Sequence, residues 1–327
     1  MSASSNNAYV FKYHKNNTYV IRYDQDVLKF FYFGCWNKEE CKSGSPFSKV
    51  LQGIEDSKIN YNFGIISGDN IYADKSINEK GDKIKVFNKD KFTKGVNCFQ
   101  SLQFPIYSNL GNHDIEMCEV YDLQIQNYPY WFLQNYYSLV LILKEFKVLV
   151  LFIDSNLFEE QTELEESCYK NIDYRKIKNE MLSWIELQLK NYQDCKHVIV
   201  VGHEPLFGYK DKKGGVFTDY TKFADLFNIF LDINRDIFFL SAHLHNFQHV
   251  EIKRESESKY KITEIIAGTG GAEADLIEER LKTAVNSAYT SKTFHARLVN
   301  KSDAYGYVSF EIDKNKISFN YKQVYKD

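Results

Sequence analysis

The stretch Tyr61-Asn-Phe-Gly-Ile-Ile-Ser-Gly-Asp-Asn-Ile-Tyr72 joins a short apolar run to a polar turn. Its first half is rich in aromatic and β-branched side chains, which is typical of a buried strand. Gly68 ends the run, and Asp69, Asn70 and Tyr72 follow directly. A strand that ends in polar side chains predicts a ligand-binding loop at the edge of a sheet.

The same pattern recurs along the chain. Strands are predicted over the apolar runs 27–33, 61–66, 104–107, 137–143, 146–153, 197–201, 237–240, 262–267, 307–312 and 317–321. Helices are predicted over 45–54, around 177–185 and over 221–234, because apolar residues recur there at helical spacing. This alternation is the signature of an α/β fold. Since no linker or internal repeat divides the chain, we expect an N-terminal extension over 1–25 and a single domain over 26–327.

Five of the predicted strands end in loops that carry chemically active side chains. These residues are Cys35 in the first loop, Asp69 and Tyr72 in the second, Asn112, His113 and Asp114 in the third, His203 and Glu204 in the fourth, and His243 and His245 in the fifth. Loops beyond strand C-termini form the ligand crevice of α/β sheets, so we expect the five loops to converge.

The side-chain types in these loops favour a metal site. Imidazole, carboxylate and amide oxygen together suit Zn, Fe or Mn better than Ca or Mg. A carboxylate such as Asp69 can bridge two ions about 3.5 to 4 Å apart, and such a pair binds a phosphoryl group and activates a bridging hydroxide for attack on phosphorus. His113 is predicted to protonate the leaving oxygen, with Asp114 beside it to orient the ring.

The ordered set of loops resembles the five motifs of the calcineurin-like metallophosphoesterases. Gly68-Asp-Asn-Ile-Tyr72 is similar to the second motif of the purple (tartrate-resistant) acid phosphatase branch, and the similarity extends from about Val27 to Tyr321. The resemblance implies a four-layer α/β/β/α sandwich, in which two mixed β-sheets are flanked by helices.

The resemblance also implies a ligand set for two metal ions. One ion would bind Asp69, Tyr72, His245 and residue 35, and the other would bind Asp69, Asn112, His203 and His243. The expected ions are iron paired with zinc, iron or manganese, and a zinc pair also fits. His113 would be the general acid.

The first motif departs from the family, because Cys35 stands where the family has Asp. A thiolate is a soft ligand that suits Zn or Fe(II) better than Fe(III). Three replacements for the lost carboxylate stay open: Cys35 itself, the amide of Asn37, or Glu39 or Glu40 reaching back from the loop. An inert, buried Cys35 is the fourth interpretation.

Two other positions bear on the substrate. Lys212 lies near the place of the family's substrate-binding His, so Asn70 and Lys212 are predicted to bind substrate, although Lys212 also fits a solvated loop. Glu204 would repel phosphate in the cleft unless it orients His203 as an outer-shell partner.

Composition excludes several classes of protein. The chain has 41 Lys and Arg against 44 Asp and Glu, a balance that argues against a nucleic-acid or anionic-membrane surface. The six Cys are scattered, so we expect no disulfide framework and treat Cys41, Cys98, Cys118, Cys168 and Cys195 as thiols. Neither a transmembrane segment nor a signal peptide is visible, which predicts a cytoplasmic protein, whereas the resembled family is typically secreted or vacuolar.

The leading hypothesis is therefore a dinuclear-metal phosphomonoesterase, an acid phosphatase-like hydrolase of phosphorylated small molecules or phosphoproteins whose activity is weakened by Cys35. The alternative is a degenerate phosphatase-like protein that acts as a scaffold or binding module for a protein partner. A metal analysis combined with a turnover assay separates the two.

Overall fold

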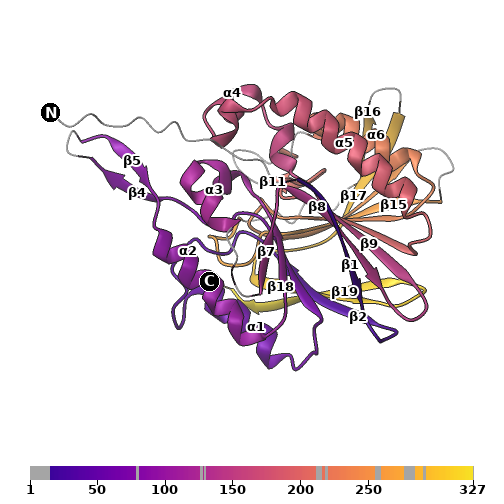
Figure 1. Ribbon diagram of the computed structural model, residues 1–327, viewed down its shortest axis with the longest axis horizontal. Coiled ribbons are helices and arrows are strands. Elements are labelled where there is room, and N and C mark those ends of the chain that lie inside the picture. Colours follow the sequence, from indigo (N-terminus) through magenta and orange to yellow (C-terminus); the bar gives the residue numbers. More distant parts are fainter. Residues whose placement is uncertain are drawn as a thin grey trace.

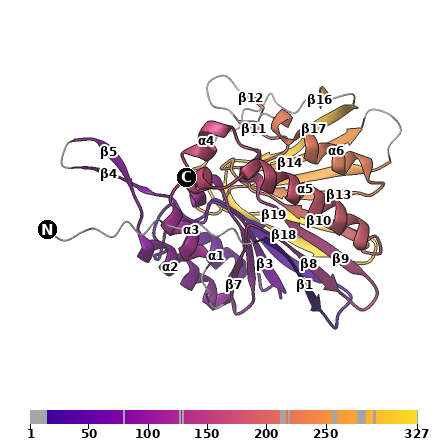
Figure 2. The ribbon, with the colours of Figure 1, turned by 45° about the horizontal axis from the view of Figure 1, so that its top comes forward.

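The computed structural model describes residues 15–78, 81–125, 128, 130–210, 216–217, 220–254, 259–275, 284–289 and 292–326. Two β-sheets face each other in these residues, and helices cover their outer sides (Figures 1 and 2). The mixed α/β sandwich that the sequence predicts is thereby confirmed.

The smaller sheet carries the first three predicted loops. Its six strands run in the order β19 (Ile317–Tyr325), β18 (Tyr305–Ile312), β2 (Leu28–Phe33), β3 (Phe63–Ser67), β6 (Ile106–Asn109) and β7 (Trp131–Leu133). From β2 to β7 neighbouring strands are parallel. The helices α1 (Pro46–Asp56), α2 (Lys89–Cys98) and α3 (Cys118–Gln124) belong to this half. Because the strands are parallel, their C-terminal loops emerge at the same edge.

The larger sheet carries the other two loops. Its nine strands run in the order β1 (Lys15–Arg22), β8 (Tyr136–Ile142), β9 (Lys147–Phe152), β10 (His197–Val201), β13 (Ile237–Ser241), β15 (Lys261–Ala267), β14 (Phe247–Arg254), β17 (Lys292–Ser302) and β16 (Ala284–Tyr289). The central strands β9, β10, β13 and β15 are parallel. The helices of this half are α4 (Gln161–Glu165), α5 (Tyr174–Asn191) and α6 (Ala224–Asp232).

Two short hairpins complete the described structure. One pairs β4 (Asp74–Ile77) with β5 (Lys83–Val86), and it projects from the body of the protein (Figure 1). The other pairs β11 (Tyr209–Lys210) with β12 (Val216–Phe217).

The strand β2 is buried on both faces, which explains its unbroken apolar sequence. On the face toward the other sheet, Phe30 stacks between Phe63 and Phe310, with ring centroids 5.1 and 4.6 Å away. On the opposite face, Phe33 packs against Phe47 of α1. The helix α1 begins as predicted, because the side chain of Ser45 accepts a hydrogen bond from the backbone N–H of Ser48.

The predicted elements are found where the sequence placed them. The ten apolar runs correspond to β2, β3, β6, β8, β9, β10, β13, β15, β18 and β19, and the three helices to α1, α5 and α6. Among the elements that were not predicted is β1, which pairs in parallel with β8 at the edge of the larger sheet. The domain division at residue 26 stays a prediction, although Lys15–Arg22 is a strand of this sheet.

Four cysteines form disulfides, so the expectation that they are thiols was wrong. Cys41 pairs with Cys98 and Cys118 with Cys168, whereas Cys35 and Cys195 are free and buried. Residues about fifty positions apart cannot be recognised as partners from spacing alone. Disulfides are typical of oxidising compartments.

Loss of the Cys41–Cys98 bond should destabilise the protein. The bond closes a loop of 57 residues, and constraint of an unfolded loop of that length is worth about 4 kcal/mol. We expect the double variant Cys41→Ser/Cys98→Ser to lose roughly this much in urea unfolding. Alkylation of the denatured, unreduced wild type should label only Cys35 and Cys195. Labelling of all cysteines would contradict the assignment.

None of the helices in the described part of the chain combines the length and the apolarity that a membrane-spanning segment needs.

Candidate metal centre

The five predicted loops meet where the C-terminal edges of the two sheets come together. Backbone hydrogen bonds join the loops directly: Cys35 N–H donates to the carbonyl of Gly68, and Ala242 N–H donates to that of His203. The hydroxyl of Ser67 in the smaller sheet donates to the carbonyl of Gly202 in the larger one. These bonds fix the loops relative to one another before any ligand binds.

Close approach of two loops depends on Gly111. A Cβ atom at this position would lie 2.3 Å from both the backbone nitrogen and Oδ1 of Asp69. No side chain fits there, so only glycine lets the third loop lie against the second. Cys35, Asp69 and His243 also adopt left-handed backbone conformations, with φ of 54, 52 and 56°. Such conformations are uncommon outside glycine and gather at functional sites.

Asp69 lies at the centre of the cluster, and its two carboxylate oxygens face different partners. Oδ1 lies 3.3 Å from Nε2 of His203 and accepts a hydrogen bond from the backbone of His113. Oδ2 accepts a 3.0 Å hydrogen bond from the hydroxyl of Tyr72 and lies 3.8 Å from Sγ of Cys35. Burial alone would raise the pKa of Asp69, but the surrounding imidazoles, His203 first, lower it overall.

On the Oδ1 side, His203 presents an unprotonated nitrogen. Its Nδ1 lies 2.8 Å from the carbonyl oxygen of Ser67, which can only accept, so Nδ1 carries the proton. Burial lowers the pKa of His203, which keeps the ring neutral and leaves a lone pair on Nε2. That lone pair faces Oδ1 of Asn112 at 3.1 Å as well as Asp69. Electron-rich atoms that face one another in this way fit a bound cation.

His243 completes this half of the cluster. Its Nδ1 lies 3.1 Å from Oδ1 of Asn112 and 2.9 Å from Oε1 of Glu204. Glu204 was expected to orient His203, but its side chain contacts His243 instead. His203 is fully buried, whereas the side chain of His243 is 24% exposed, so the cluster opens to solvent on the His243 side.

On the Oδ2 side, His245 is held in the same way as His203, with one ring nitrogen bonded to a backbone carbonyl and the other facing the cluster. Its Nδ1 donates to the backbone carbonyl of Glu273 at 2.9 Å, and burial lowers its pKa. The free Nε2 lies 3.3 Å from the hydroxyl of Tyr72. The structure thus brings together Cys35, Asp69, Tyr72, Asn112, His203, His243 and His245, all the residues predicted as metal ligands.

Cys35 lies in this half as a fully buried thiol. Burial raises its pKa, and the nearby charge of Asp69 raises it further, so without a cation the thiol is protonated. Of the other proposed replacements, Asn37 donates through its amide nitrogen to the backbone carbonyl of Lys91, Glu39 is exposed, and Glu40 pairs with Lys94 at the surface.

His113 lies at the mouth of the cluster, with its ring centroid 4.5 Å from that of Tyr72. The contact that orients it comes from Glu116, whose Oε1 lies 2.8 Å from Nδ1 of His113. Burial by itself would lower the pKa of His113, but Glu116 and Asp69 raise it overall. Lys85 of the projecting hairpin in turn pairs with Glu116 at 2.9 Å. The sequence analysis missed Glu116, although its i+3 spacing in the same turn was visible.

Asp114 was predicted to orient the ring of His113, but its carboxylate is hydrogen-bonded to backbone N–H groups instead. It accepts hydrogen bonds from the N–H groups of Asn70, Ile71 and Gly111. Burial raises the pKa of Asp114, with the charge of Asp69 as the next cause. Asp114 therefore ties the second loop to the third, and its charge is one of the causes that raise the pKa of His113.

The predicted substrate-binding residues are not both accessible. The amide of Asn70 is fully buried and bonds with Trp36, Ser108, Asn109, Asp114 and Gln124, so it faces protein rather than a ligand. Lys212 lies outside the described residues.

Glu264 of β15 holds the fourth and fifth loops together. Its carboxylate accepts hydrogen bonds from the backbone of Leu206 and Phe207 and from the hydroxyl of Ser241. Burial raises its pKa from 4.5 to about 8.

The raised pKa of Glu264 predicts a pH-dependent stability. Between these two values the folded state holds a proton that the unfolded state releases, so the stabilisation is complete below pH 4.5 and is lost as pH rises to about 8. The slope is up to about 1.4 kcal/mol per pH unit. Urea midpoints measured in EDTA should show this decline in the wild type and a flatter profile in Glu264→Gln. Parallel profiles would contradict the assignment.

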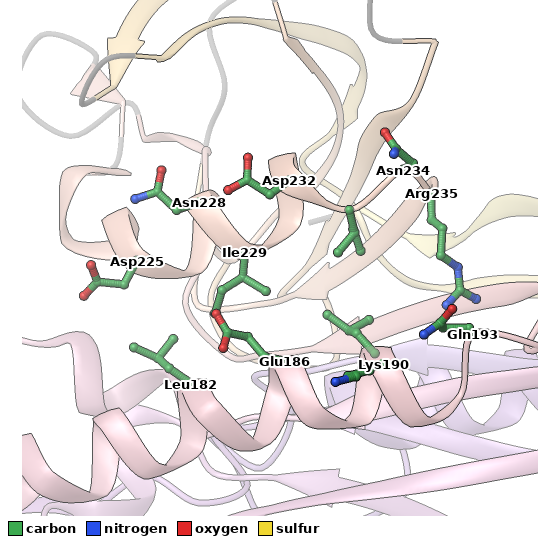
Figure 3. Close-up of a pocket in the computed structure, with 12 residues that line it drawn as sticks. Leu182, Glu186, Lys190, Gln193, Asp225, Asn228, Ile229, Asp232, Asn234 and Arg235 are labelled. Atoms are coloured by element: carbon green, nitrogen blue, oxygen red, sulfur yellow. The ribbon is translucent and has the colours of Figure 1, made fainter.

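A separate pocket of about 720 Å³ lies between α5 and α6 (Figure 3). Leu182, Glu186 and Lys190 line one side, and Asp225, Ile229 and Asp232 line the other. None of its lining residues belongs to the cluster around Asp69, so the pocket has no part in that chemistry.

A parallel-stranded sandwich with imidazole, carboxylate and amide groups at its C-terminal edge defines a class of metal-assisted phosphoesterases. The chain belongs to the calcineurin-like phosphoesterase family, whose model matches residues 15–247. This family uses divalent metals. The described residues contain two candidate ligand groups, Cys35/Asp69/His203 and His203/Glu204/His243.

Several solved structures are similar to this chain at low sequence identity, and the first of them shares its fold. GAP50, the anchor in the inner membrane complex of Plasmodium, is 18% identical with a TM-score of 0.56, over 92% of this chain and 85% of that one. A candidate 5′-nucleotidase from Staphylococcus aureus is 15% identical with a TM-score of 0.43, over 92% and 55%. The protein TT1561 of Thermus thermophilus is 11% identical with a TM-score of 0.41, over 91% and 99%. No curated protein matches the sequence significantly.

Proposed function

We propose that the protein is a metal-dependent phosphomonoesterase of the purple acid phosphatase kind, with Asp69 as the residue shared by two ions. The observation that carries this proposal is the division of the Asp69 carboxylate. One oxygen faces His203 and the other faces Tyr72 and Cys35, while His203 and His245 direct unprotonated nitrogens toward the two sides. Iron with zinc, iron or manganese, or a zinc pair, suits these ligands.

When bound, two such ions polarise a phosphoryl group and provide a strong nucleophile near neutral pH. The chain itself supplies positioning and a proton. His203, Asn112 and His243 would bind on one side, and His245 and Tyr72 on the other. His113 would donate a proton to the leaving oxygen, because its side chain is one-third exposed at the mouth and Glu116 holds its ring.

The direct test combines metal analysis with turnover of p-nitrophenyl phosphate from acid to neutral pH. The proposal expects bound metal and turnover that EDTA abolishes. Metal-loaded protein that does not hydrolyse phosphomonoesters would overturn the enzymatic function.

A second candidate function is a scaffold that has lost efficient catalysis. The specific observation in its favour is the buried thiol of Cys35 in place of a carboxylate. The structural neighbour GAP50 is described as an anchor, but at 18% identity that likeness concerns the fold alone. Cys35→Asp separates the two functions: a large gain in metal affinity and rate would indicate a weakened site, and a loss would indicate that the thiol is an adapted ligand.

The two disulfides bear on the compartment. They support folding in an oxidising environment, such as the secretory pathway or an organelle lumen. A tagged protein that resists alkylation at Cys41 and Cys98 when labelled in intact cells would support this location.

A further inference from the structure

The carboxylate missing at position 35 has a counterpart on the other side of the cluster. We propose that Glu204 is a metal ligand, so that the side formed by Asp69, Asn112, His203, His243 and Glu204 binds the first cation and the Cys35 side binds a second one more weakly. This inference rests on the metal site of the proposed function and adds a ligand and an order of occupancy to it.

The spacing of the atoms on this side fits a coordination shell. Oδ1 of Asp69 lies 3.3 Å from Nε2 of His203, which lies 3.1 Å from Oδ1 of Asn112. The chain of contacts continues with 3.1 Å from Asn112 to Nδ1 of His243 and 2.9 Å from there to Oε1 of Glu204. Ligands bound at about 2.1 Å to one ion are themselves roughly 3 Å apart. Candidate ligand atoms of His203, Glu204 and His243 also lie within 4.8 Å of one another.

Glu204 is held so that one oxygen faces this shell and the other does not. Oε1 contacts His243, while Oε2 lies 3.4 Å from the ammonium of Lys222. Lys222 is itself paired with Glu159. This arrangement resembles a ligating carboxylate whose second oxygen is fixed by an outer partner.

The backbone beneath Glu204 is fixed as well. The N–H groups of His203 and Glu204 both donate to the hydroxyl of Ser155, at 2.9 and 3.0 Å. One hydroxyl thus fixes the backbone of both proposed ligands. The side chain of Glu204 is only 6% exposed, so its carboxylate faces the cluster and not solvent.

Charge decides the order of occupancy. The Glu204 side offers two carboxylates, two imidazoles and an amide. The Cys35 side offers one carboxylate, which is the other oxygen of Asp69, together with a thiol, a phenol and the imidazole of His245. A first divalent ion is therefore stabilised more on the Glu204 side.

Titration of the metal-free protein with Co²⁺ and Zn²⁺ tests the proposal, with affinity read by calorimetry and ligation by absorption. Glu204→Gln keeps an oxygen that can accept from His243 but removes the charge. Loss of the ligand should weaken the first equivalent by more than about 100-fold, beyond the 10- to 100-fold that removal of an outer partner alone costs. Cys35→Ala should leave the first equivalent unchanged, and the first Co²⁺ should give no thiolate charge-transfer band. Glu311→Gln, which removes an exposed carboxylate paired with Lys29, is the matched control.

A first equivalent that Glu204→Gln binds less than about 100-fold more weakly than the wild type would overturn the role of Glu204 as a ligand, since loss of an orienting partner alone costs about 10- to 100-fold. A thiolate band with the first Co²⁺ would overturn the order. Both results leave the proposed function standing. A wild type that binds no metal would refute that function and this inference together. Phosphatase turnover plays no part in the readout.

Discussion

Asp69→Asn should abolish both metal binding and phosphatase activity. Asp69 links the two sides of the cluster. Its Oδ1 faces His203 on one side, and its Oδ2 faces Tyr72 and Cys35 on the other. An amide keeps the shape of the side chain but directs an N–H toward one side and removes the charge that both ions would share. Because metal ions contribute several kcal/mol to phosphoryl transfer, kcat/KM should fall on the order of 10³-fold or more.

The folded state should survive this substitution. Asp69 is a buried charge that metal-free protein must accommodate, so thermal melting in EDTA should show Asp69→Asn to be about as stable as the wild type. Asp194→Asn is the matched control, because Asp194 is an exposed carboxylate paired with Lys147. Retention of metal and of turnover within tenfold in Asp69→Asn would contradict the central role of this residue.

His113→Gln should reduce turnover in a way that depends on the leaving group. General acids contribute about 10²- to 10⁴-fold, and an alkyl phosphate requires the full contribution because an alkoxide leaves poorly. p-Nitrophenolate leaves without a proton, so hydrolysis of p-nitrophenyl phosphate should fall by only about tenfold. Metal content should not change, since the ring of His113 lies against Tyr72 and Glu116.

Glu116→Gln is the companion variant, because it removes the charge beside His113 and leaves the imidazole in place. It should reduce alkyl phosphate hydrolysis less than His113→Gln does. If His113→Gln slows both substrates equally, His113 does not protonate the leaving group, and its role is limited to binding.

The parts of the fold that could be predicted are those determined by local sequence. β2 and β3 read as continuous apolar runs because both faces of each strand are buried. α1 carries its own cap at Ser45 and a first-turn proline. β1 was missed because Lys15–Arg22 is a polar segment. It lies at the edge of its sheet, where a strand has a neighbour on one side only and can carry polar residues.

The clustering of the residues predicted as metal ligands could be foreseen, because each follows the end of a strand and the C-terminal ends of parallel strands lie at the same edge of a sheet. Outer contacts could not be predicted, since they depend on side-chain direction. Asp114 and Glu116 both follow His113 closely, and only the local turn decides that Glu116 faces the imidazole while Asp114 faces the backbone. The disulfides were missed for a related reason, because the paired cysteines are 57 and 50 positions apart and only the tertiary fold brings them together.

The most direct measurement is anomalous diffraction from a crystal soaked in Zn²⁺ and recorded at the zinc absorption edge. We expect a cation between Asp69, His203, Asn112 and His243, and a second one near Tyr72 and His245 at higher zinc concentration, with ligand distances of about 2.0 to 2.2 Å. Zinc bound only elsewhere on the protein, with the cluster around Asp69 empty, would refute the proposed metal centre.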